Sequence, residues 1–182
     1  ECVDRLNSSG CRMVQISVDG DKNTNDRIRG AGAFHNALEA MRLLRENKIE
    51  VTVNMTVSGI NIDDIEKVMK LASRNANRFS VSRLVPINKA KPLGVDDILS
   101  PEDVNRCFRK VFRFKSNCSE IDIPLRDPLW HAFMRVSPKR YSHNIHGCSA
   151  GFNGITVDYD GTIYPCRRLP LPIGNILEDD LL

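Results

Sequence analysis

The sequence lacks a hydrophobic run long enough to cross a membrane, and we expect no signal peptide at its start. No apolar stretch approaches the roughly 18 residues that a transmembrane helix needs. It also lacks a strong charge of either sign: 26 Lys and Arg against 23 Asp and Glu leave a net charge of +3. With no run of basic residues, attraction to nucleic acid or to a membrane surface is not indicated.

Nothing in the sequence indicates secretion. Its six cysteines could form three disulfides, but a chain of 182 residues that is 41% hydrophobic can bury a core without such cross-links. We therefore expect reduced thiols and a cytoplasmic protein. The chain begins at Glu1 rather than Met, and residues 178–182 resemble a helix start that has been cut short. We expect a piece of a longer protein.

The first half of the chain alternates between two hydrophobic periods. Apolar residues occupy alternate positions in three segments, residues 14–18, 51–57 and 79–85. Between these segments, apolar residues recur at helical spacing over residues 34–44 and 65–72. Asn61 and Asp64 resemble a capping pair for the second of these helices. The strand starts lie 37 and 28 residues apart, about the length of a βα unit, which predicts parallel strands.

One face of the first two predicted strands is polar, and it carries Ser17 and Asn54. Parallel strands covered on both faces are normally apolar throughout. The pattern leaves two alternatives: an open face against solvent with locally satisfied hydroxyls, or a barrel lumen that holds a polar ligand. We favour the lumen, because flanking helices leave the other side unexplained. Arg83, in the third strand, must face solvent, a carboxylate or such a lumen.

Asp19 and Arg29 bracket a predicted glycine-containing loop after the first strand. Such a pair could bind a ligand that has both hydroxyl and carboxylate groups, because Asp accepts from hydroxyls and Arg pairs with carboxylates. The alternative is a turn aspartate next to a solvated arginine.

The second half begins with a strong helix start. Ser100 is followed by Pro101 and Asp103, which predicts a capping box and a helix to about residue 115. A short strand is predicted over residues 121–125. Residues 155–158 and 162–164 flank Asp160-Gly161, a typical hairpin signal.

Cys148 and Cys166 lie on either side of this hairpin, which would bring two soft ligands together around a tight turn. Three interpretations remain open. The cysteines could be structural thiols or a disulfide. They could bind zinc together with His143 and His146. They could also form half of an iron–sulfur site whose other ligands lie elsewhere. Cys107, within the apolar helical pattern, is expected to be a buried core residue.

Several of these motifs together resemble the radical SAM enzymes. Val14-Gln-Ile-Ser-Val-Asp-Gly20, Asn25-Asp-Arg-Ile-Arg-Gly30 and Arg83-Leu-Val-Pro86 are similar to the middle of the family's barrel. The C-terminal motifs resemble the opening of its SPASM or twitch extension; they are Cys148-Ser-Ala-Gly151, Asp160-Gly161-Thr-Ile-Tyr-Pro-Cys166 and Gly174-Asn-Ile176.

The resemblance implies an α/β fold: part of a (β/α)6 partial barrel, followed by the start of a small β-hairpin extension. It implies residues 1–95 as the C-terminal half of the barrel, 96–140 as a connecting region and 141–182 as the extension. It also implies cofactor-binding roles in the lumen, where Ser17 and Asn54 would contact S-adenosylmethionine (SAM) and Arg29 its carboxylate. Asp19 and Arg83 are further candidates of this kind. Cys148 and Cys166 would be ligands of an auxiliary [4Fe–4S] cluster.

The family's Cys-x3-Cys-x2-Cys motif, which holds the SAM-cleaving cluster, is absent from these residues. By resemblance, the parent enzyme cleaves SAM reductively to a 5′-deoxyadenosyl radical that abstracts hydrogen, and this chain alone is expected to be inactive. A peptide, a protein or a small molecule would be the substrate, in peptide maturation or cofactor biosynthesis, with an external electron donor. A non-catalytic zinc-binding module or a degenerate relative is the alternative.

Overall fold

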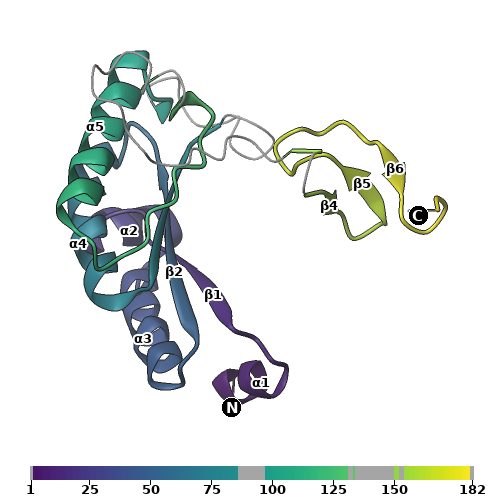
Figure 1. Ribbon diagram of the computed structural model, residues 1–182, viewed down its shortest axis with the longest axis horizontal. Helices are drawn as coiled ribbons and strands as arrows, with labels where there is room; N and C mark the ends of the chain where they lie inside the picture. Colours follow the sequence, from purple (N-terminus) through teal and green to yellow (C-terminus); the bar gives the residue numbers. More distant parts are fainter. Residues whose placement is uncertain (1, 86–96, 131–132, 134–149, 152–153, 181–182) are drawn as a thin grey trace.

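The computed structural model describes residues 2–85, 97–130, 133, 150–151 and 154–180. Figure 1 shows a parallel sheet with helices along one side and a small separate sheet near the C-terminus. None of the helices in these ranges has both the length and the hydropathy needed to cross a bilayer.

The first sheet has the strand order β1-β2-β3, formed by β1 (Met13–Ser17), β2 (Glu50–Val57) and β3 (Arg78–Arg83). Both strand pairs are parallel, as the spacing predicted. The register aligns Ile16 with Val53 and Val53 with Phe79, so the apolar positions of the three strands share one face. Only β2 is central, and the outer edge of β1 has no strand partner among the described residues.

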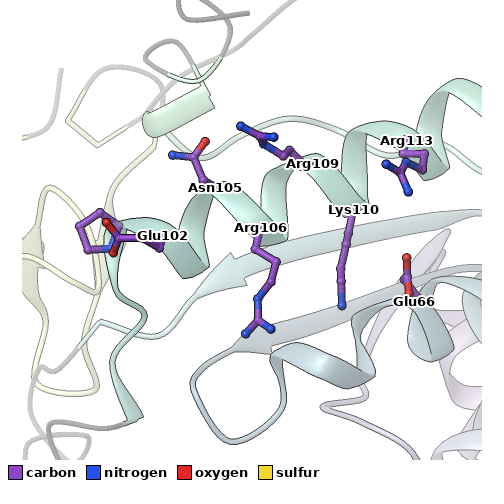
Figure 2. Close-up of a pocket in the computed structure, with 8 residues that line it drawn as sticks. Glu66, Glu102, Asn105, Arg106, Arg109, Lys110 and Arg113 are labelled. Carbon is purple, nitrogen blue, oxygen red and sulfur yellow. The ribbon is translucent and has the colours of Figure 1, made fainter.

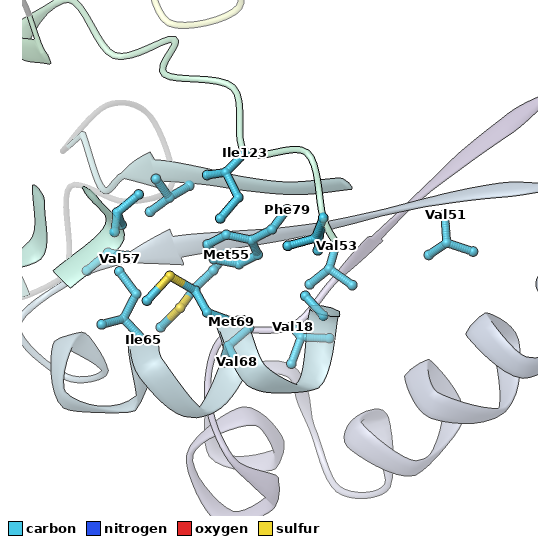
Figure 3. Packing of buried hydrophobic residues seen from close by; sticks show 14 of the residues in the cluster. Val18, Val51, Val53, Met55, Val57, Ile65, Val68, Met69, Phe79 and Ile123 are labelled. Atoms are coloured by element: carbon cyan, nitrogen blue, oxygen red, sulfur yellow. The ribbon is translucent and has the colours of Figure 1, made fainter. Parts of the chain in front are cut away.

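The apolar face of this sheet is covered mainly by α3 (Ala33–Glu46) and α4 (Ile65–Asn75), which connect the strands, and α5 (Pro101–Asn117) packs against α4. The remaining helices are α1 (Cys2–Ser8) before the sheet, α2 (Lys22–Arg29) after β1 and the 3-10 turn η1 (Ile62–Asp64) before α4. Figure 3 shows Val53, Met55 and Phe79 of the sheet packed against Val68 and Met69 of α4. All five side chains are essentially inaccessible to solvent, as the helical spacing of residues 65–72 predicted.

Residues 121–125, predicted as a short strand, form one isolated bridge beside β3 instead of a strand. Asp122 pairs in parallel with Arg78, and its carbonyl accepts a hydrogen bond from the Phe79 N–H at 2.9 Å. Ile121, Ile123 and Leu125 are buried. This segment therefore covers the β3 edge and leaves the two edges of the sheet unequal.

The start of α5 follows the predicted capping box. The Ser100 hydroxyl accepts from the Asp103 N–H at 3.1 Å, and the Asp103 carboxylate accepts in return from the Ser100 N–H at 3.4 Å. Pro101 occupies the first turn, where a missing N–H costs nothing.

We expect Ser100→Ala to lower the free energy of unfolding by about 1 kcal/mol, the usual contribution of an N-cap side chain. Urea unfolding followed by circular dichroism measures this change. Ser100→Asp, which retains a side-chain acceptor, is the matched control and should restore most of the loss. Equal destabilisation by both variants would contradict a capping role.

The segment between Asp19 and Arg29 is a helix rather than the predicted loop. Asp21 caps α2 by accepting from the Thr24 N–H at 3.1 Å, and Gly30, with φ of 100°, ends it. The loop prediction was wrong because α2 has only eight residues and only a short apolar pattern. The sequence did contain one indication of the helix end, Gly30, because glycine is the residue that most often ends a helix.

The small C-terminal sheet contains β4 (Thr156–Val157), β5 (Thr162–Tyr164) and β6 (Gly174–Asn175), all antiparallel. The predicted hairpin is confirmed: Asp158 and Thr162 close it, and the Asp160 carboxylate accepts from the Thr162 N–H at 3.0 Å. Gly161 adopts φ of 86°, a conformation that favours glycine.

Candidate functional site

Ser17, Asn54 and Ser80 form a row of polar side chains across the parallel sheet. The register pairs Ser17 with Asn54 and Asn54 with Ser80, so all three project from the same face. This face is opposite to the one that Val53 and Met55 present to the helices. Asn54 is only 8% exposed, yet none of the three side chains makes a hydrogen bond within the described part of the chain. Their donors and acceptors are therefore available to a polar ligand.

Asp19 joins the carboxyl ends of β1 and β2. Its Oδ1 accepts from the Thr56 N–H at 2.8 Å, and its Oδ2 lies 2.7 Å from a guanidinium nitrogen of Arg29. The carboxylate is almost fully buried, whereas Arg29 is about one-third exposed. The sequence left two alternatives for this pair: a site in which Asp19 and Arg29 each bind part of a ligand, or a turn aspartate next to a solvated arginine. In the structure the two side chains pair with each other, and Asp19 holds the strand ends in place.

Two buried asparagines, which sequence reasoning did not mark as site residues, complete this end of the sheet. The Asn61 amide donates to the carbonyls of Asp19 and Thr56 at 2.8 and 2.9 Å, and the Asn25 Oδ1 accepts from the Asp19 N–H at 2.8 Å. Their residue type could have indicated this role, because short polar side chains such as asparagine often form hydrogen bonds with nearby backbone groups. Asn61 makes no side-chain capping bond, so its predicted capping role was wrong.

Arg83 lies apart from this polar row. It pairs in register with Val57, on the face that the helices cover. Its Nε and one terminal nitrogen lie 2.6 and 3.2 Å from the two oxygens of Asp127, whose side chain is 7% exposed. The sequence left solvent, a carboxylate or a polar lumen as the possible surroundings of Arg83, and in the structure its guanidinium faces a carboxylate.

Cys166 lies in a tight turn that follows β5, whereas Cys148 is outside the described residues. The Arg168 N–H points at the Cys166 sulfur at 3.4 Å, and the Leu169 N–H donates to the Cys166 carbonyl at 2.9 Å. The thiol is free and half-buried. A backbone N–H directed at sulfur stabilises a thiolate, and such bonds tune iron–sulfur clusters. The turn therefore fits a cluster or metal ligand.

No group of three or more possible metal ligands occurs among the described residues. His143 and His146, the other zinc ligands predicted for that alternative, lie outside the described residues. Cys107 is a buried core residue, as expected, and burial raises the pKa of its thiol to about 12.

Two family models match separate parts of the chain. Residues 1–72 match the Radical SAM superfamily, and residues 148–182 match SPASM, an iron–sulfur cluster-binding domain. The first match contains Ser17, Asp19 and Asn54, and the second contains Cys148 and Cys166. Both agree with the resemblance seen in the motifs.

Curated relatives are similar along nearly the whole chain. An AdoMet-dependent heme synthase of Methanosarcina barkeri is 29% identical over 98% of this chain and 54% of its own length. The sporulation killing factor maturation protein SkfB of Bacillus subtilis is 28% identical over 100% and 42%. The mycofactocin maturase MftC of Mycolicibacterium smegmatis is 26% identical over 98% and 45%. The chain thus spans about half the length of these relatives.

Solved structures have a similar fold. AnSMEcpe with bound AdoMet superposes with a TM-score of 0.68 at 22% identity, covering 98% of this chain and 51% of that one. SuiB from Streptococcus suis gives 0.70 at 15% identity, covering 93% and 42%. At these identities the likeness shows the α/β fold of radical SAM enzyme structures.

Proposed function

We propose that this chain, which matches the Radical SAM superfamily over residues 1–72 and SPASM over residues 148–182, provides the SAM-binding sheet and an auxiliary-cluster ligand turn of a radical SAM enzyme. The parallel sheet would form part of a (β/α)6 partial barrel. We keep the boundaries of residues 1–95, 96–140 and 141–182 for barrel, connection and extension. The observation that carries this proposal is the row of Ser17, Asn54 and Ser80, which is sheltered and has unused hydrogen-bonding groups.

The polar row would hold SAM through its hydroxyl and amide groups. Asn54, on the central strand, offers both a donor and an acceptor, while Ser17 and Ser80 offer hydroxyls on either side. Asp19 and Asn61 would keep the strand ends fixed, so the row needs little rearrangement on binding. Arg29 is the remaining candidate for the methionyl carboxylate, because part of its guanidinium is exposed beside Asp19. Arg83 does not belong to this group.

When bound, SAM and the iron–sulfur clusters supply the one-electron chemistry that generates a carbon radical and abstracts hydrogen from the substrate. Two relatives are named as a maturation protein and a maturase, SkfB and MftC, and others as heme synthases. We favour a peptide or protein substrate. An external electron donor would serve the clusters.

Asn54→Leu tests the SAM site, because it keeps the side-chain volume similar and removes both hydrogen-bonding groups. We expect SAM to bind the reconstituted holoenzyme about tenfold more weakly, which corresponds to the loss of one net hydrogen bond of about 1.4 kcal/mol. Isothermal titration calorimetry gives the dissociation constants.

Gln15→Leu is the matched control for this experiment. Gln15 lies on the same face of β1, one polar position nearer the amino end, and is exposed. It should leave SAM affinity unchanged. A wild-type protein that does not bind SAM, or equal effects of the two variants, would refute the proposed site.

A further inference from the structure

A mostly apolar cavity lies beside the carboxyl end of β3 and the amino-terminal half of α5. Its volume is about 370 Å³. This volume is within the range of small-ligand pockets. The walls come from three parts of the chain and include Arg83, Leu99, Val104, Phe108, Leu129 and Phe133. The polar row of the proposed SAM site does not contribute to it.

The aromatic side chains at this cavity are held in place by their packing on one another before any ligand binds. Phe108 stacks on Trp130 with ring centroids 3.9 Å apart, and Phe133 meets both rings edge-on at 5.7 and 5.5 Å. Phe108 and Trp130 are fully buried, so their positions are set by packing. An apolar group can therefore enter without the wall having to rearrange.

Arg83 is the charged side chain at this cavity, and Asp127 already orients it. The Asp127 carboxylate accepts hydrogen bonds from the Arg83 Nε at 2.6 Å and from one terminal nitrogen, Nη2, at 3.2 Å. It also accepts from the Leu129 N–H at 2.9 Å. The second terminal nitrogen, Nη1, takes no part in these bonds. Because Asp127 neutralises the guanidinium, its remaining N–H groups suit a neutral acceptor such as a carbonyl.

A second hollow on α5 has a different set of lining residues. Figure 2 shows it lined by charged side chains, with Arg106, Arg109 and Lys110 along the helix and Glu102 and Glu66 nearby. An apolar group that covered these charged groups would remove them from water, which is unfavourable. The two hollows therefore differ in the ligands they favour, and the aromatic one suits an apolar side chain.

We propose that the aromatic cavity binds an apolar side chain of a peptide substrate while Arg83 Nη1 donates to a main-chain carbonyl of the same segment. The inference rests on the peptide substrate proposed above and specifies what part of it this chain recognises. The cavity would act as a specificity pocket, because an apolar residue fills it and a polar one leaves its own groups unsatisfied.

Trp130, the one tryptophan of the sequence, provides a direct reporter. The probes are two capped peptides, acetyl-Leu-Phe-Leu-amide and acetyl-Ser-Asn-Ser-amide, titrated into the reconstituted holoenzyme. We expect the apolar peptide to change the tryptophan fluorescence saturably, with no such signal in Trp130→Phe, and the polar peptide to bind at least tenfold more weakly. Equal affinity for the two peptides overturns the proposal.

Two variants test the contacts separately. Val104→Phe should fill the cavity and weaken apolar-peptide binding at least tenfold, and Arg83→Lys, which keeps a charge beside Asp127, should weaken it about fivefold. Arg106→Met, in the charged hollow, is the control and should have no effect. An unchanged affinity in Val104→Phe overturns the inference, whereas retained SAM binding in the same sample shows that the proposed function still stands.

Discussion

Cys166→Ser is expected to abolish binding of the auxiliary cluster. A serine hydroxyl is a far weaker ligand for iron than a thiolate, and loss of one of the cluster's cysteines removes a strong bond. After anaerobic reconstitution with iron and sulfide, we expect the variant to lack one cluster's complement of iron and sulfide and the matching share of absorbance near 400 nm.

The structure gives a second reason to expect a large effect at this position. The Arg168 N–H is directed at the sulfur at 3.4 Å within a turn that the Leu169 N–H closes. The turn thus presents residue 166 as a ligand. Cys148→Ser should have the same outcome if both residues hold one cluster.

Cys2→Ser is the matched control for the cluster experiment. Cys2 is exposed on α1 and belongs to the other segment of the chain. Its iron content and spectrum should equal those of the wild type. An unaltered spectrum in Cys166→Ser would contradict the ligand role, and zinc retained by a colourless wild-type protein would restore the zinc alternative.

Asp19→Ala is expected to lower the free energy of unfolding by about 3 kcal/mol, because it breaks a buried contact between two strands and a helix. The Thr56 N–H loses its acceptor, and Arg29 loses its ionic partner. For a chain of this length the melting temperature should fall by roughly 9 °C. Thermal and urea unfolding of the purified protein measure the two quantities.

Two further variants separate the contributions at Asp19. Asp19→Asn keeps an oxygen for the Thr56 N–H and loses only the charge, so it should recover about half of the stability. Arg29→Ala removes the partly exposed partner and should cost about 1 kcal/mol. A destabilisation by Asp19→Ala that is no larger than that of Arg29→Ala would show that the backbone contact contributes little.

The sheet could be predicted from the sequence because alternation is a local property. The positions of Ser17 and Asn54 opposite the apolar residues of their strands followed from parity alone, and the parallel register then made them neighbours. The same alternation along β3 places Arg83 on the same face of the sheet as Phe79 and Val81. Its ion pair with Asp127 could not be predicted, because the two residues are 44 positions apart and meet only through tertiary packing.

The supporting contacts of the site were harder to predict than the row itself. Asn61 has the residue type and spacing of a helix cap, but its amide donates to the Thr56 carbonyl, five residues away, and to the distant Asp19 carbonyl instead. Sequence reasoning chose the local use because it had no knowledge that the Asp19 and Thr56 carbonyls lie within reach. The cluster ligands rested on family motifs, and the turn around Cys166 adds an independent physical argument for one of them.

Because the two edges of the parallel sheet differ, a further strand can be added at one of them and not at the other. Residues 121–125 protect the β3 edge, whereas the outer edge of β1 has no strand partner in the described part of the chain, and Met13 and Gln15 are exposed there. A further parallel strand can join only alongside β1. In a preparation where none does, two molecules can pair through this edge, so aggregation is expected to increase with protein concentration.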